Sequence, residues 1–450
     1  MRYLGYFVIG VSPFPLASTA PIWHWFWIIT ISFTLLAKLM WQSKSETPAT
    51  SRQSTVAFAL MTLVVIWGYT QATAPYKISQ LLQLDAPFSL DVIHHFLSIN
   101  REATLTTTSR LLGTFIFFVA LSTFYSQLQE NHGKVEAAFF CFVSLVVSAY
   151  ALYGFSIFVS GNKTVLWYDK SASLGSLTGT FINRNNFAAF LGLGLQSTIA
   201  YALYHFRQKA RPSNAELLNT SISLLKNTWW LILVIILLVT SLILTSSRAG
   251  IASVIASIFV LLCMSSEFQF RNILRMKNVA TFLILIFSIL FLINFSGEAL
   301  IDRGIEDYSL TQRLNSLPQI FNAYQNTPII GSGLGTFSEV FPIFRKATVD
   351  LHLVRAHNDY FELAITAGPI VVTMFVLAII LIMIRITLNL KGRGPLRPLM
   401  AVSISSTFQI ASHSIVDFPL QIPPIAFLWC GILSVGLGIT HNRRIIHSNV

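Results

Sequence analysis

The densest group of residues able to do acid–base chemistry lies at residues 355–362, RAHNDYFE, directly before an apolar run. The positive end of a helix dipole favours the neutral form of a nearby imidazole, so His357 could accept a proton from a hydroxyl group. Asp359 followed by Glu362 also fits a helix cap with its capping-box partner, a purely structural role. Because this cap does not account for His357, we expect His357 to be a general base.

Arginines at the entrances of apolar runs are the second group of candidates. Arg184 lies in TGTFINRNNFA (178–188) and Arg248 in the tight turn LTSSRAG (244–250). A guanidinium at the hydrocarbon boundary is costly unless it reaches the headgroups or pairs, and headgroup contact alone could explain each arginine. The alternative is that both bind a lipid-linked phosphate, which suits the guanidinium fork and the free N–H groups of a helix N-terminus. Further candidate ligands are Asn183, Asn185, Ser246, Ser247, Arg303, Arg313, Arg345 and Arg355.

Other kinds of site fit the sequence less well. The histidine and carboxylates of segment 355–362 could ligate a metal ion, but the predicted outer loops contain no Asp-x-Asp pair. A serine hydrolase would need a Gly-x-Ser-x-Gly elbow, which is absent. The glycine-rich segment 328–337 follows no strand of a βαβ unit, so we expect a turn that shapes an outer cavity. His413 and Asp417 have the spacing of neighbours on a helix and are expected to line the site.

The elements that must position these residues are membrane helices. Of 450 residues, 54% are hydrophobic and 11% charged, with a mean hydropathy of +0.65, whereas soluble domains are about 25% charged. This composition excludes a soluble protein. Twelve apolar runs approach the length of about 20 residues that a spanning helix needs, and they lie at residues 3–18, 22–41, 55–73, 109–126, 136–158, 186–205, 229–245, 249–264, 279–296, 361–384, 399–416 and 423–440. The predicted fold is an all-α integral membrane bundle of about 12 transmembrane helices; ten or eleven spans with a re-entrant segment is the alternative.

The distribution of charge sets the predicted orientation. The net charge is +12, and 18 of the 30 Lys and Arg fall on one side of the twelve-span arrangement, as the positive-inside rule expects of the cytoplasmic side. The basic excess is therefore topological and indicates no nucleic-acid partner. Both termini are expected in the cytoplasm, the first run being a retained helix and not a cleaved signal. The long polar stretches 74–108, 159–184 and 297–360 are then outside, and the chemistry is expected at the outer leaflet.

Four motifs, taken together, resemble the O-antigen ligase and polymerase superfamily. They are GTFINRN at 179–185, SSRAG at 246–250, Arg313 followed by the segment 328–337, and HNDY at 357–360. The resemblance implies a bundle of about a dozen membrane helices with a large periplasmic loop between helices 9 and 10, before the histidine helix. It also implies transfer of a glycan from undecaprenyl pyrophosphate to an acceptor hydroxyl, with inversion at the anomeric carbon, without a metal ion and without a cofactor.

Ligases of this family carry a histidine, then Asn, Ser or Gln, then nine residues and a glycine. His357, Asn358 and Gly368 match this spacing, but the position three beyond the glycine, often Gly, Thr or Tyr, is Val371. This departure weakens the case for a ligase in the strict sense over a polymerase or a protein-glycosylating relative. The resemblance implies catalytic roles for His357, Arg248 and Arg313 and substrate-binding roles for Asn183, Arg184, Asn185, Ser247, Arg355, Asn358 and Tyr360.

The predicted organisation has N-terminal helices in residues 1–174, a catalytic region in 175–425 with the loop 297–360, and a last helix and tail in 426–450. The expected location is the bacterial inner membrane, with the active site facing the periplasm. Expected partners are the undecaprenyl-pyrophosphate-linked glycan, a lipid or protein acceptor, with lipid A core first, and membrane lipid. A surface polysaccharide polymerase, a protein O-oligosaccharyltransferase and a transporter of an anion or lipid remain alternatives. A transporter would place its ionisable groups near the bilayer midplane on broken helices.

Overall fold

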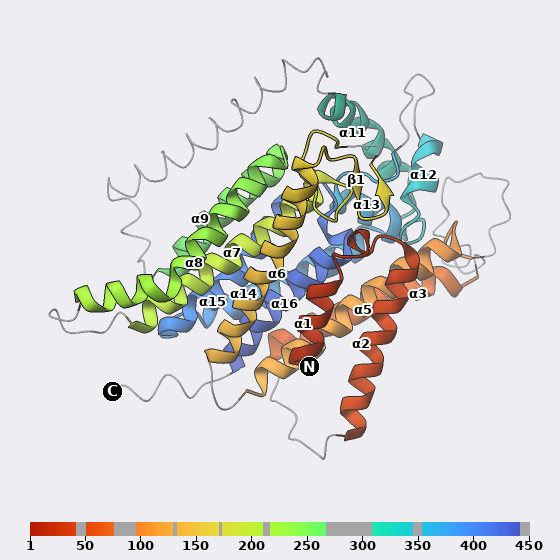
Figure 1. Cartoon of the computed structure of the whole chain (residues 1–450). Coiled ribbons are helices and arrows are strands. Elements are labelled where there is room, and N and C mark those ends of the chain that lie inside the picture. Colours follow the sequence, from red (N-terminus) through yellow and green to blue (C-terminus); the bar gives the residue numbers. More distant parts are fainter. Residues whose placement is uncertain are drawn as a thin grey trace, which may run out of the picture.

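The computed structural model describes residues 1–41, 51–75, 96–128, 133–170, 173–209, 217–266, 308–344 and 353–441, and these ranges are mostly helical (Figure 1). The helices are α1 (Arg2–Val11), α2 (Pro21–Trp41), α3 (Arg52–Thr73), α5 (Arg101–Ser126), α6 (Lys134–Val159), α7 (Arg184–Lys209), α8 (Leu217–Leu244), α9 (Arg248–Ser265), α11 (Tyr308–Asn326), α12 (Phe337–Phe344), α13 (Asp359–Ala367), α14 (Pro369–Leu388), α15 (Arg397–His413) and α16 (Pro423–His441). Short 3-10 turns lie at Leu16–Ser18, Gly394–Leu396 and Pro419–Gln421, and a hairpin pairs β1 (Thr164–Val165) with β2 (Tyr168–Asp169).

The all-α membrane class is confirmed. Within the described ranges, seven helices are long and apolar enough to cross a membrane, namely α3, α5, α6, α7, α9, α14 and α16. The number of twelve spans stays a prediction. Its ninth run, 279–296, lies outside the described residues.

Two predicted spans differ from the structure. The run 3–18 forms only α1, which has 10 residues and so reaches about 15 Å, half of the hydrocarbon thickness. The chain turns after α1 through Pro13 and the left-handed Leu16–Ser18. The run 361–384 is divided into α13 and α14 at Gly368, whose φ of +94° no helix can contain.

Helix α16 is the centre of the bundle, because every residue from Pro423 to Thr440 is buried. It packs along α5 on one side and against α15 on the other, as Figure 1 shows. Glycines permit these close approaches: a Cβ on Gly438 would lie 2.3 Å from the Cβ of Tyr125, and one on Gly436 would lie 2.2 Å from the hydroxyl of Ser403. Small residues bring membrane helices together in this way.

The helices α11, α12 and α13 and the hairpin β1–β2 lie together at one end of the bundle, hereafter the site end (Figure 1). Helix α15 ends there, because the Tyr360 hydroxyl of α13 donates to the Ala411 carbonyl at 2.9 Å. Helix α7 begins beside the end of α15, because the Gln409 amide donates to the Ala189 carbonyl at 2.9 Å. The N-termini of α7 and α13 and the C-terminus of α15 therefore face the same side of the bundle.

Candidate active site

The His-Asn-x9-Gly spacing corresponds to one short helix, α13. Asn358 is its N-cap, with extended backbone and a side chain that accepts from the Phe361 N–H at 3.0 Å. The cap predicted at Asp359 is therefore wrong by one residue. The amide of Asn358 also donates to the Ile415 carbonyl at 2.9 Å, which ties α13 to the chain after α15. The nine intervening residues are α13 itself, and Gly368 ends it.

The backbone conformation at the end of α13 requires a glycine at position 368. A Cβ at this position would lie 2.2 Å from the Ile329 carbonyl oxygen, in the glycine-rich segment 328–337. That segment binds the end of α13, because Ser332 N–H donates to the Ile365 carbonyl at 3.1 Å. Its Leu334 and Gly335 line a cavity, so the predicted turn that shapes a cavity is confirmed.

Gly368→Ala is expected to lower the free energy of unfolding by at least about 3 kcal/mol, because it adds a clash with the Ile329 carbonyl to left-handed strain of about 1 kcal/mol. Gly161→Ala is the matched control, since Gly161 has a φ of +99° with no atom within 4 Å of its Cβ position. Thermal unfolding of the two purified variants measures the difference. Equal melting temperatures for the two variants would contradict the clash.

Glu362 holds the loop that precedes α13. Its carboxylate accepts from the Ala356 N–H at 2.8 Å and from the Arg355 guanidinium at 3.0 Å. Glu362 is buried, whereas the Arg355 side chain is 32% exposed. Arg355, predicted to bind substrate, is thus held beside the start of α13 by a buried carboxylate.

His357 lies at the site end with left-handed backbone, at a φ of +50°. Its Nδ1 is 3.6 Å from the Asp417 Oδ1, a distance within ion-pair range but longer than a hydrogen bond. The imidazole is 26% exposed and the Asp417 side chain 1% exposed, so the carboxylate backs the ring from inside the protein. A carboxylate that orients an imidazole is the usual partner of a general base.

Asp417 is the functional candidate whose role the sequence understated. From its spacing with His413, it was expected to line the site or to support the residues that do. The structure retains that turn, because the Asp417 N–H donates to the His413 carbonyl at 3.0 Å. Asp417 reaches His357 because the chain between α15 and α16 folds back over the start of α13.

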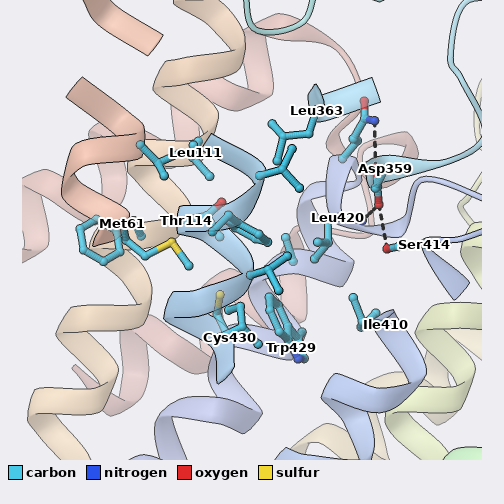
Figure 2. Close-up of a pocket in the computed structure, with 18 of the residues that line it drawn as sticks. Met61, Leu111, Thr114, Asp359, Leu363, Ile410, Ser414, Leu420, Trp429 and Cys430 are labelled. Carbon is cyan, nitrogen blue, oxygen red and sulfur yellow. Dashed lines mark hydrogen bonds between the residues drawn. The ribbon is translucent and has the colours of Figure 1, made fainter. Parts of the chain in front are cut away.

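Asp359 joins α13 to that same chain segment. Its buried carboxylate accepts from the Ser414 hydroxyl at 2.9 Å, the Gln421 amide at 3.0 Å and the Leu420 N–H at 3.4 Å. Figure 2 shows Asp359 and Ser414 pointing toward one another at the edge of the cavity. Burial raises the pKa of Asp359 from its usual 3.8 to about 7, and nearby Glu362 acts in the same direction.

Stability is therefore expected to fall as the pH rises from 5 to 8. Folded Asp359 keeps its proton up to a pKa of about 7 while the unfolded chain loses it near 3.8, so the loss is at most about 1.4 kcal/mol per pH unit within that window. Asp359→Asn should remove this part of the slope. Asp169→Asn, at an exposed position of β2, should leave it. Melting temperatures at pH 5 and pH 8 test this, and an unchanged slope in Asp359→Asn would contradict it.

The predicted phosphate ligands gather where α7 and α9 begin. Arg184 is the first residue of α7 and Arg248 the first of α9. The Ser247 hydroxyl, which caps α9, donates to the Asn185 side chain at 2.7 Å and so joins the two helix N-termini. Asn183 accepts from the Asn185 N–H at 2.8 Å. Two arginines and two helix N-termini at one place suit an anion.

Arg313 lies on α11, a helix within the stretch 297–360 that is predicted to form the large outer loop. The position of its side chain is outside what the structure describes. The described contacts of the other candidates form two groups, one at the N-termini of α7 and α9 and one around α13 and the chain after α15. Both groups lie at the site end, next to the C-terminal part of α15.

A cavity of about 380 Å³ lies beside the second group, between α3, α5, α13, α14, α15 and α16. Asp359, Tyr360, Glu362 and Gln421 are among the polar residues that line it, whereas most of its lining is apolar. Figure 2 shows Asp359 at its edge, which we call the polar end. Arg110 of α5 is also at the polar end and donates to the Gln421 carbonyl at 2.8 Å. Sequence reasoning missed Arg110, although an arginine inside a predicted span (109–126) is itself a signal of a functional site.

Residues 233–376 match the family described as O-antigen ligase, a segment that includes Arg248, Arg313 and His357. No curated protein matches the chain. The match confirms the resemblance seen in the motifs: residues 233–376 are similar to the O-antigen ligase family.

Proposed function

We propose that the chain is an inner-membrane glycosyltransferase that moves a glycan from undecaprenyl pyrophosphate to a hydroxyl group of lipid A core. The family match supports a glycosyltransferase of the O-antigen ligase and polymerase type. The observation that carries the finer proposal is His357 backed by buried Asp417 at 3.6 Å. This pair lies at the same end of the bundle as Arg184 and Arg248.

In the proposed reaction, His357 Nε2 accepts the proton of the acceptor hydroxyl. The hydroxyl oxygen forms a bond to the anomeric carbon as the bond from that carbon to the diphosphate oxygen breaks, with inversion. Asp417 faces Nδ1 and stabilises the imidazolium that results. The proton is released from His357 to water afterwards.

The leaving group is undecaprenyl pyrophosphate, whose negative charge grows as the bond breaks. Arg184 and Arg248 would bind the diphosphate, with Asn183, Asn185 and Ser247 beside them and Arg313 as a third cation. Positive groups fixed where charge develops stabilise the transition state more than the ground state. Both arginines begin helices, which supports a reaction at the membrane surface over translocation through the midplane.

The test is an in vitro reaction of the purified, reconstituted chain with an undecaprenyl-pyrophosphate-linked glycan and three separate acceptors. The acceptors are lipid A core, a second lipid-linked glycan unit and a pilin-like peptide. The proposal predicts that product forms with lipid A core. Product with the second glycan unit alone would identify a polymerase, and product with the peptide alone a protein O-oligosaccharyltransferase. No product with any acceptor would contradict the proposed function.

A further inference from the structure

Arg110 is a charged residue within a membrane-crossing helix. It lies ten residues into α5, one of the seven helices able to span a membrane, and it lines the cavity. Its described hydrogen bond goes to a neutral acceptor, the Gln421 carbonyl. Among the residues that the structure describes, no carboxylate lies within ion-pair distance of Arg110. A guanidinium has five N–H donors, and a charge within a membrane-crossing helix is costly without an anion.

The two carboxylates near Arg110 are occupied by other donors. Glu362 accepts from Arg355 and from the Ala356 N–H. Asp359 accepts from Ser414, Leu420 and Gln421, and burial raises its pKa to about 7, so it is partly neutral near that pH. The polar end of the cavity therefore presents a cation whose charge is not matched by a direct carboxylate partner.

The rest of the cavity is apolar. Its walls come from α3, α5, α14, α15 and α16 and carry Met61, Leu111, Phe375, Ile379, Met383 and Trp429. Figure 2 shows Met61, Leu111, Trp429 and Cys430 around this space, with Asp359 at its edge. A space between membrane helices with one cationic end is complementary to an amphiphile, with its hydrocarbon chain along the walls and its anionic head at Arg110.

We propose that this cavity binds a membrane lipid with a phosphate headgroup, with one hydrocarbon chain between the helices and the phosphate on Arg110. Phosphate is the anion that the planar guanidinium fork binds best. The site is distinct from the arginines of α7 and α9, because neither Arg184 nor Arg248 lines the cavity. In the transfer reaction the bound lipid is the acceptor and not the donor, an assignment that rests on the proposed function.

Photolabelling tests the binding site without any transfer reaction. The full chain in lipid nanodiscs is labelled with dodecyl phosphate that carries a diazirine at the chain end, and the labelled peptides are mapped. We expect saturable labelling of peptides from α14 and α16, at least 10-fold stronger than with the corresponding alcohol. Arg110→Met should reduce phosphate labelling to the level of the alcohol. Arg101→Met, on the same helix but exposed, should label like the unmodified chain.

A second variant tests the cavity independently of any folding defect that Arg110→Met causes. Thr114→Trp, which fills the cavity next to its apolar wall, should reduce labelling by both probes while the melting temperature stays near that of the unmodified chain. Equal saturable labelling by phosphate and alcohol would overturn the headgroup site at Arg110. Labelling outside the cavity, or labelling that Thr114→Trp does not reduce, would overturn the proposal that the hydrocarbon chain of the lipid lies in this cavity.

Transfer kinetics test which substrate the cavity holds. Arg110→Met should raise KM for the lipid acceptor at least 10-fold and leave KM for the donor within about 2-fold. A rise in the donor KM alone would overturn the acceptor assignment. If no acceptor is glycosylated at all, the proposed function and the acceptor assignment fail together, whereas the lipid site is decided by labelling alone.

Discussion

His357→Ala is expected to lower the rate of glycan transfer by about 10²- to 10⁴-fold, the range that a positioned general base contributes. The imidazole is 26% exposed and its Nδ1 lies 3.6 Å from Asp417 Oδ1, which leaves Nε2 as the nitrogen that we propose to accept the proton. Loss of the base should lower kcat and leave KM for the donor almost unchanged, because the arginines that we propose to bind the diphosphate, Arg184 and Arg248, begin other helices, α7 and α9. Initial rates with the reconstituted protein measure both constants.

Two controls separate the base from general damage. His441→Ala changes a histidine at the far end of α16, where its Nδ1 lies 3.0 Å from the Leu437 carbonyl, and should keep the rate of the unmodified chain. Asp417→Asn keeps the shape of the side chain but removes its charge, and should lower kcat by about 10- to 100-fold, as loss of an orienting partner does at other imidazole sites. Transfer at the unmodified rate by His357→Ala would show that another group is the base.

Arg248→Gln is expected to lower kcat by about 10²- to 10³-fold, because each fixed donor to a developing negative charge contributes about that much. Arg248 begins α9 next to Ser247, whose hydroxyl joins α9 to Asn185 of α7. Loss of its charge should affect the leaving diphosphate more than the bound substrate, so kcat should fall more than KM for the donor rises. Steady-state kinetics with varied donor concentration measure the two effects.

Arg52→Gln is a matched control for Arg248→Gln. Arg52 also begins a helix, and its neighbour Ser51 caps α3 as Ser247 caps α9. Arg52 lies away from the site end, because the other end of α3 reaches it: the Gln71 amide donates to the Ile330 carbonyl at 2.8 Å. Arg52→Gln should leave kcat unchanged. An equal loss in both variants would indicate an effect on membrane orientation or folding and would contradict a role of Arg248 in the chemistry.

The sequence predicted most of the long helices because a run of about 20 apolar residues has few alternatives to a membrane helix. It did not predict the division of the run 361–384. Hydropathy continues through Gly368 and Pro369, so a window average cannot register one left-handed residue. The family spacing from His357 to Gly368 marked the position at which the run is divided. The division arises because a short helix ends against Ile329, and this contact belongs to the tertiary structure.

Of the candidate site, the sequence predicted the residues that begin helices or lie in one of the family's motifs. The pair of Arg184 and Arg248 followed from helix starts, and the structure brings their neighbours Asn185 and Ser247 into contact. The roles of Asp417 and Arg110 could not be predicted in this way. Asp417 reaches His357 through a fold of the chain between α15 and α16, and Arg110 meets Gln421 across 311 positions of sequence. Local spacing carries no information about such contacts.

The most direct test of the account is an experimental structure of the chain with an undecaprenyl-pyrophosphate-linked glycan bound. We expect a diphosphate within about 4 Å of the guanidinium groups of Arg184 and Arg248. We also expect the sugar to extend toward His357 and the lipid chain to lie outside the Arg110 cavity. A diphosphate held by Arg110, with Arg184 and Arg248 in contact with other groups only, would contradict it.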